Sequence, residues 1–185
     1  MIRQATLADA KAIATLTVAA MPDLAMQFCA SNHIDDAIRL LEHFIALEGN
    51  QYSYHNALVY VADGEIAGSI SGYDGAQIKQ LRQPFFAYLQ ENYHPNGFEM
   101  EYESELGEYY LDTISVSPLH QGKGIGKSLI KAALQHAKAL GHSKAGLLVD
   151  EENPDARRLY EKLGFEAIGH KILLGKMHHH LSYRL

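Results

Sequence analysis

The feature that most constrains the fold of this chain is a glycine-rich junction, HQGKGIGKSL, at residues 120–129. A β-rich run, YLDTISVSP, ends just before it at Pro118, and apolar residues recur at helical spacing after it, from Ile125 to Ala137. The junction therefore predicts a strand, a tight turn and a helix in succession. Glycines let the backbone N–H groups of such a turn point at a ligand, and the positive end of the helix dipole favours an anion. The alternative is a turn that binds nothing.

Local signals predict the elements on both sides of this junction. Thr6 and Asp9 have the spacing of a capping box, between a short strand at 2–6 and a helix at 10–20. Asp63-Gly64, between two strand-like runs, predicts a hairpin. The other expected elements are a helix over 34–45, a strand over 144–150, a helix from Pro154 to Gly164, and strands over 165–174 and 177–185.

The order of these elements describes one mixed α/β domain over residues 1–185. A helical and acidic insert at about 75–108 interrupts their rhythm. The first part of the insert is helix-like, and Pro84 is expected to kink this helix or to start a second one.

The insert also carries glutamates at positions 99, 101, 103, 105 and 108. A charge run usually lies in a solvated loop, which is the favoured interpretation. If the segment is extended, four of these carboxylates form an acidic wall that attracts a cationic acceptor. The aromatic residues Phe85, Phe86 and Tyr88 could line an acceptor site, although packing of the helix onto the core is the favoured role.

The composition excludes several classes of function. A formal net charge of −6 argues against a nucleic-acid binder that relies on positive charge, and against an anionic membrane surface as partner. The single cysteine, Cys29, excludes an internal disulfide and suits a reducing compartment. No apolar run is long enough to span a membrane, and the first residues lack the apolar stretch of a signal peptide. A cytoplasmic location is therefore expected.

Two familiar nucleotide motifs do not fit the junction. The last three residues of the P-loop motif, G-x-x-x-x-G-K-[ST], match Gly126-Lys127-Ser128. The first glycine of the motif does not match, because Gln121 occupies its position. The dinucleotide fingerprint G-x-G-x-x-G also fails, because the glycines at 122, 124 and 126 are spaced G-x-G-x-G.

Together with its flanks, the junction resembles the GCN5-related N-acetyltransferase (GNAT) superfamily. That family carries a [QR]-x-x-G-x-[GA] motif between its fourth strand and third helix, and residues 121–126 match it. LDTISVSP is similar to the fourth strand, and NPDARRLYEKLGF to the later motif with an Asn, a helix bearing a Tyr, and a Gly-Phe. The resemblance implies a mixed, mostly antiparallel sheet flanked by helices. Its parallel fourth and fifth strands would splay apart to form the coenzyme cleft.

The resemblance also implies acetyl-coenzyme A as the acetyl donor and assigns residues to it. The backbone of Ile114, Ser115 and Val116 would pair with the pantetheine arm like an added strand. The Val116 N–H could also face the thioester oxygen. Asn153 would contact the coenzyme arm, and capping of the helix at Pro154 is an equally good role for it. The pyrophosphate would lie on the backbone amides of Gln121, Gly122, Lys123, Gly124, Ile125 and Gly126.

Acetyl transfer to an amine needs an acid for the leaving thiolate and a base for the amine. Tyr160 matches the general-acid position of the family, and core packing is the alternative role of its ring. The base is open: Asp112 is a candidate, and Glu108 and His120 are weaker ones. Family members that acetylate protein N-termini often carry a glutamate in the fifth strand, where this chain has Leu147, Leu148 and Val149. This difference argues against protein N-termini as acceptors.

The favoured function is an acetyl-CoA-dependent N-acetyltransferase acting on a small-molecule amine. A catalytically silent acyl-CoA sensor or interaction module is the alternative from another class, and a nucleotide-binding protein is a third. The two terminal strands could support a homodimer. Side chains alternate along a strand, so among His178–His180 only the first and third could share a ligand, and no metal site is expected. Cys29 lacks a partner for a nucleophilic role.

Overall fold

The structure is a computed structural model that describes residues 1–185. Its strands are β1 (Ile2–Gln4), β2 (Ala57–Ala62), β3 (Glu65–Asp74), β4 (Tyr109–Val116), β5 (Lys144–Asp150), β6 (Glu166–Leu173) and β7 (Lys176–Arg184). Its helices are α1 (Ala10–Ala20), α2 (Pro22–Phe28), α3 (Ile34–Ile45), α4 (Ile78–Asn92), α5 (Ile125–Ala139) and α6 (Pro154–Lys162). The longest helices, α4 and α5, have 15 residues each, and none could cross a bilayer.

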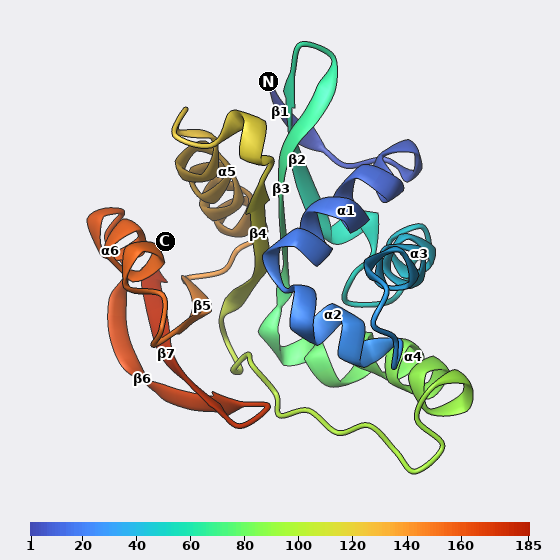
Figure 1. The fold of residues 1–185 in the computed structure, drawn as a ribbon. Coiled ribbons are helices and arrows are strands. Elements are labelled where there is room, and N and C mark those ends of the chain that lie inside the picture. Colours follow the sequence, from blue (N-terminus) through green and yellow to red (C-terminus); the bar gives the residue numbers. More distant parts are fainter.

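The seven strands form one sheet in the order β1-β2-β3-β4-β5-β7-β6 (Figure 1). Only β4 and β5 run parallel, and all other neighbours are antiparallel. This confirms the expected mixed α/β sheet with a parallel central pair.

The parallel pair separates soon after it starts. Its register contains only Tyr109↔Ala145 and Tyr110↔Gly146. Beyond these pairs β4 stays with β3, while β5 stays with β7 over its whole length. Because each strand follows its own antiparallel partner, the sheet forks between them, as the family resemblance implied. Figure 1 shows this fork between the part containing β5, β6, β7 and α6 and the rest of the molecule.

Helices cover the two faces of the sheet. Helix α5 packs on one face and buries its apolar stripe, including Ile125, Leu129 and Ile130, against β3, β4 and β5. Helices α1 to α4 lie on the other face, where Phe28, Leu41 and Phe85 are buried in a second apolar core (Figure 1). The full burial of Phe85 and Leu89 confirms that the insert's helix packs onto the core.

Several local predictions are confirmed. Asp63 and Gly64 both have positive φ, as the two-residue hairpin turn between β2 and β3 requires. Gly164, predicted to end its helix, has a φ of 99° directly after the C-cap of α6, and Gly141 has a φ of 89° at the same position after α5. At both positions only glycine adopts the left-handed conformation without strain.

One helix was not predicted, and one of the two expectations for Pro84, the start of a second helix, is excluded. Helix α2 was not predicted, although Pro22 at its first position is a typical helix start. Helix α4 continues through Pro84 as one element. Proline removes one backbone donor, and the buried side chains of Phe85 and Leu89 hold both halves of the helix on the core.

Candidate active site

The glycine-rich junction forms an open turn at the start of α5. Gly122 and Gly124 have φ values of 75° and 77°, and Gly124 is the N-cap of the helix. A Cβ built at either glycine would meet no atom within 4 Å. These glycines are therefore required by the backbone conformation, and the space above them is open to a ligand.

The turn presents an unbroken run of free backbone donors. None of the N–H groups of residues 121–127 donates to an acceptor within the protein. The first that does is Ser128, whose N–H lies 3.1 Å from the carbonyl oxygen of Gly124. Converging free N–H groups at a helix N-terminus form a binding site for phosphate groups.

The strand edge beside this turn offers further donors. The N–H of Ser117 donates to the carbonyl of Ala67 (2.9 Å), and that of Thr113 to Oγ of Ser71 (3.2 Å), so both point toward β3. Backbone direction alternates along a strand, which turns the N–H groups of Ile114 and Val116 into the fork and that of Ser115 toward β3. An extended amide-bearing chain in the fork can therefore pair with Ile114 and Val116.

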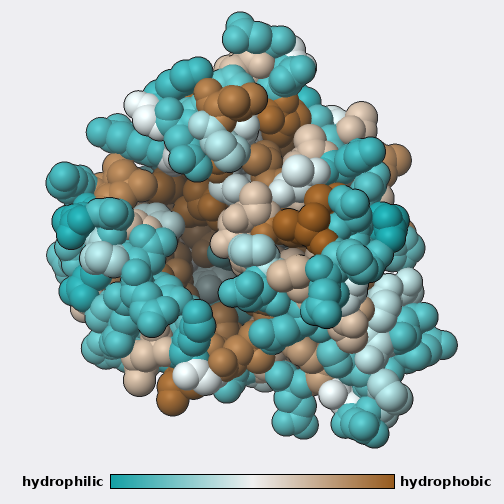
Figure 2. Space-filling view, viewed as in Figure 1, coloured by the Kyte–Doolittle hydropathy of each residue, from teal (hydrophilic) through white to brown (hydrophobic).

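A cavity of about 260 Å³ lies at the fork. Apolar residues of α1, α2 and β5 form part of its wall, including Ala20, Leu24 and Leu148. Figure 2 shows a hollow with apolar residues inside it at the corresponding place between the two parts of the molecule. Three carboxylates also line the cavity, those of Glu103, Asp112 and Asp150, and no lysine or arginine does.

Helix α6 brings two of the predicted residues to this cavity. Oδ1 of Asn153 accepts a hydrogen bond from the N–H of Ala156 at 3.1 Å, which confirms its capping role. Tyr160 packs its ring edge-on against Phe165, with 5.8 Å between the ring centroids, and also lines the cavity. Burial raises the pKa of Tyr160 to about 12, so its hydroxyl stays protonated throughout the neutral range.

Of the candidate bases, only Asp112 lies in the cavity. Its carboxylate accepts hydrogen bonds from the hydroxyls of Tyr73 (2.9 Å) and Thr113 (3.0 Å). Burial raises the pKa of Asp112, and the hydrogen bond from Tyr73 opposes this. Glu108 is fully buried elsewhere, where its Oε2 lies 3.0 Å from Nε2 of His180. Neither Glu108 nor His120 lines the cavity.

The structure adds Glu103 to the site, from a segment that was expected to be a solvated loop. Glu103 is 6% exposed, and its Oε1 lies 3.0 Å from Nη2 of Arg82 on α4. Burial raises the pKa of Glu103 to about 8, with the charge of Asp112 acting in the same direction and Arg82 opposing it. The alternating glutamates were the only sequence signal, and only Glu103 and Glu108 among them are buried.

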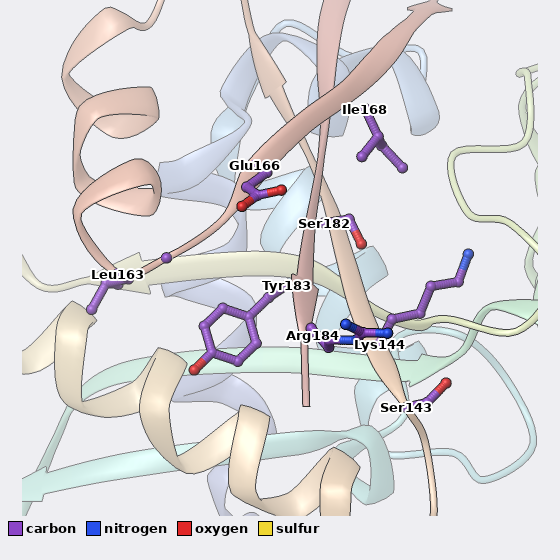
Figure 3. Close-up of a pocket in the computed structure, with 9 residues that line it drawn as sticks. Ser143, Lys144, Leu163, Glu166, Ile168, Ser182, Tyr183 and Arg184 are labelled. Atoms are coloured by element: carbon purple, nitrogen blue, oxygen red, sulfur yellow. The ribbon is translucent and has the colours of Figure 1, made fainter.

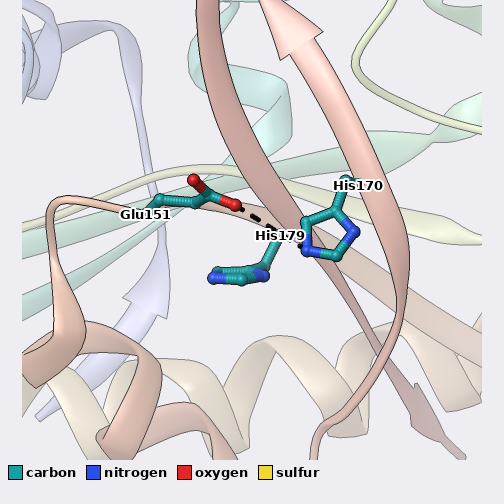
Figure 4. A group of neighbouring side chains, drawn as sticks. All are labelled: Glu151, His170 and His179. Carbon is teal, nitrogen blue, oxygen red and sulfur yellow. Dashed lines mark ion pairs between the residues drawn. The ribbon is translucent and has the colours of Figure 1, made fainter.

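The group that comes nearest to a metal set is Glu151, His170 and His179, whose ligand atoms lie within 4.8 Å of one another (Figure 4). It contains neither His178 nor His180, because the histidine that meets another histidine is His179, which β7 places opposite His170 of β6. All three side chains are at least partly exposed. Nη1 of Arg157 lies 2.9 Å from Nε2 of His179, which gives that ring nitrogen a partner within the protein.

A second hollow, of about 750 Å³, lies beyond the end of α6 and shares no lining residue with the cavity at the fork (Figure 3). Its walls include Glu166 and Ile168 of β6 and Lys144 of β5. It contains one carboxylate, that of Glu166, and none of the predicted site residues, so we place the candidate active site at the fork.

Comparison with known proteins agrees with this geometry. A family model described as Acetyltransferase (GNAT) family matches residues 19–165. A crystal structure described as an acetyltransferase superimposes with a TM-score of 0.84 at 33% identity, covering 100% of this chain and 98% of that one.

Two curated relatives match shorter stretches. A mycothiol acetyltransferase of Streptosporangium roseum is 50% identical over 60 residues, which are 32% of this chain and 17% of the relative. A spermine/spermidine N(1)-acetyltransferase of Bacillus subtilis is 36% identical over 72 residues, 38% of this chain and 47% of the relative. The matches thus span less than half of either relative. The family match and the full-length structural match show that the chain belongs to the GNAT family of acetyltransferases.

Proposed function

We propose that this enzyme transfers the acetyl group of acetyl-CoA to the amine of a small molecule. The observation that carries the proposal is the run of unpaired backbone N–H groups at residues 121–127. This run lies at one end of a forked sheet whose cavity is lined by Tyr160.

In this proposal the coenzyme lies along the fork. Its pyrophosphate accepts hydrogen bonds from the free amides of residues 121–126, at the positive end of the α5 dipole. Its pantetheine amides pair with the outward backbone of Ile114 and Val116, while Ser115 remains bound to β3. Asn153 is positioned to contact the same arm, because its Nδ2 has no partner within the protein while Oδ1 caps α6.

The acceptor nitrogen attacks the thioester carbon to form a tetrahedral intermediate. The N–H of Val116 stabilises the negative charge that develops on the carbonyl oxygen. When the carbon–sulfur bond breaks, Tyr160 donates its proton to the departing thiolate. The hydroxyl of Tyr160 makes no hydrogen bond within the protein and is free to point at the sulfur.

Three observations favour a small acceptor. The cavity volume of about 260 Å³ suits a small molecule. Strand β5 carries Leu147, Leu148 and Val149 and so lacks the glutamate expected for protein N-termini. The two curated relatives are named for mycothiol and for spermine and spermidine. A cytoplasmic location and a homodimer remain predictions, the latter on edge strand β6, where Ile168 is 53% and Ile172 54% exposed.

The test is acceptor-dependent release of free thiol from acetyl-CoA over a panel of polyamines, amino sugars, amino acids and arylalkylamines. Tyr160→Phe is expected to lower kcat about 100-fold or more while leaving coenzyme affinity unchanged. Tyr183→Phe is the matched control, because Tyr183 packs on Phe165 with 5.3 Å between the centroids and lies outside the cavity. Coenzyme binding without turnover on any amine would favour the sensor alternative. Absence of coenzyme binding would refute the proposed site.

A further inference from the structure

The floor of the cavity holds more negative than positive charge. Glu103 comes from the coil between α4 and β4, and Asp112 from β4 itself. Arg82 is the only guanidinium paired with either, at 3.0 Å from Glu103 and 3% exposed. With both carboxyls ionised, Glu103, Asp112 and Arg82 together carry a net charge of −1, and the nearby Lys171 pairs with the outer Glu105 at 3.4 Å.

The two carboxylates are held in place by the protein around them. Nε of Arg82 donates to Oε1 of Gln51 (3.1 Å), and Nε2 of Gln51 donates to Oδ2 of Asp112 (3.4 Å). The guanidinium and Gln51 thus connect Glu103 to Asp112. The coil that carries Glu103 is fixed from the other side, because Nζ of Lys171 donates to the Glu103 carbonyl at 2.9 Å.

Two buried atoms of this network have no hydrogen-bond partner, Oε2 of Glu103 and Nη2 of Arg82, although Nη2 lies 3.0 Å from Oε1 of Glu103. Oε2 of Glu103 is buried and accepts no hydrogen bond, although Oε1 of the same carboxyl lies against Arg82. A buried carboxylate oxygen without a donor is costly, and such oxygens are normally satisfied by the protein, by water or by a ligand. Glu103 also lines the cavity, so a ligand there that carries N–H donors and positive charge can pair with this carboxyl.

We propose that Glu103 and Asp112 together form the site for the ammonium group of the acceptor and take the proton that this group must lose. The substrate class is therefore amines that are cationic at neutral pH. The inference rests on the proposed function and deepens it, since it assigns the base and explains the acidic lining.

The protons balance as follows. The acceptor enters as R–NH₃⁺ and gives one proton to the carboxylate pair, which releases it to solvent. The neutral amine then attacks, and its second proton leaves when the intermediate collapses. Tyr160 gives its own proton to the sulfur, and the second proton of the amine restores the Tyr160 hydroxyl. The products are R–NH–COCH₃, coenzyme A thiol and one released proton.

The pair is suited to this task by its surroundings. Burial raises the pKa of both carboxyls, which brings them nearer to the pKa of an alkylammonium group, about 10, than an exposed carboxylate would be. The charged and titratable groups that face them are Arg82 of α4, Lys171 of β6, His178 of β7, Tyr73 of β3, Tyr110 of β4 and Tyr52 of the coil before β2.

The kinetic test compares Glu103→Gln and Asp112→Asn with Glu101→Gln, which lies two residues away on the exposed side of the same coil. With an alkylamine acceptor, each of the first two variants is expected to lose about 100-fold or more in kcat/KM, and the acid limb of the pH profile should shift. With an arylamine, which is already neutral at pH 7, the loss should be less than about tenfold. Equal losses with both acceptors, or no loss with the alkylamine, would overturn the inference.

A second measurement does not depend on turnover. Carboxyl ¹³C NMR of Glu-labelled protein is expected to show one glutamate that titrates in the neutral to mildly alkaline range and disappears in Glu103→Gln. Adding a polyamine alone should move its midpoint to lower pH, because the bound cation favours the ionised carboxyl. If the parent shows no turnover but this shift occurs, the proposed function fails and the ammonium site stands. If the polyamine does not change the titration midpoint of Glu103, the ammonium site is refuted.

Discussion

Gly126 offers a sharp test of the coenzyme site, because its substitution should separate binding from folding. Gly126 is the second residue of α5 and does not have a positive φ. A Cβ built there would lie 3.7 Å from Cγ2 of Val116, which is an ordinary contact. The fold can therefore accept alanine at this position, while the added methyl stands at the junction of the turn and β4.

The expected magnitudes follow from this geometry. Alanine is favoured over glycine in a helix by up to about 1 kcal/mol, which corresponds to an unchanged Tm or a rise of about 2–4 °C in a chain of this size. If the methyl keeps one phosphate oxygen from the Gly126 amide, the loss of one hydrogen bond to a charged group costs about 1.5–3 kcal/mol. Coenzyme A should then bind roughly 10- to 150-fold more weakly.

Calorimetric titration with coenzyme A and a thermal melt of Gly126→Ala measure the two effects separately. Gly124→Ala is the contrasting variant, because its φ of 77° should cost about 1 kcal/mol in stability as well. An unchanged affinity in Gly126→Ala would show that its amide does not face the pyrophosphate. A fall in Tm of that variant would refute the packing argument.

Two predictions concern the buried carboxylates. A Cβ at Gly146 would lie 2.1 Å from Oε2 of Glu108, so Gly146→Ala should break the buried pair with His180. The cost is about 3 kcal/mol or more, or about 6–12 °C in Tm, and an unchanged melt would contradict it. The second concerns Glu103, whose pKa of about 8 in the folded state exceeds its value of about 4.3 in an unfolded chain. Between these values the folded state binds more protons, so its contribution to stability falls as pH rises. Urea unfolding should show a smaller fall in the free energy of unfolding from pH 5 to pH 8 for Glu103→Gln than for the parent. Equal falls in the two proteins would refute this prediction.

The sequence by itself determined the elements whose signals are local. Glycines at 64, 122, 124, 141 and 164 mark turns because their positive φ values are open to few other residues. The spacing of apolar residues determined helices α3 and α5 for a similar reason, since a helix repeats over a few neighbours. The motif around residues 121–126 and Tyr160 indicated the family, and these two parts lie at one fork of the sheet.

Tertiary structure decided which charges are buried. Asp112 was a candidate base because the sequence predicts its place on the strand before the glycine-rich junction. From the sequence, Glu103 could not be distinguished from Glu101 and Glu105 beside it, which are exposed. Its burial depends on Arg82, and its link to Asp112 runs through Gln51, which lies 61 positions before Asp112 in the chain. The partners of the β7 histidines also depend on the tertiary structure. The side chain of His180 contacts that of Glu108, and strand register places His179 opposite His170. The free energy of a charge depends on what surrounds it in space, and only the folded chain brings those surroundings together.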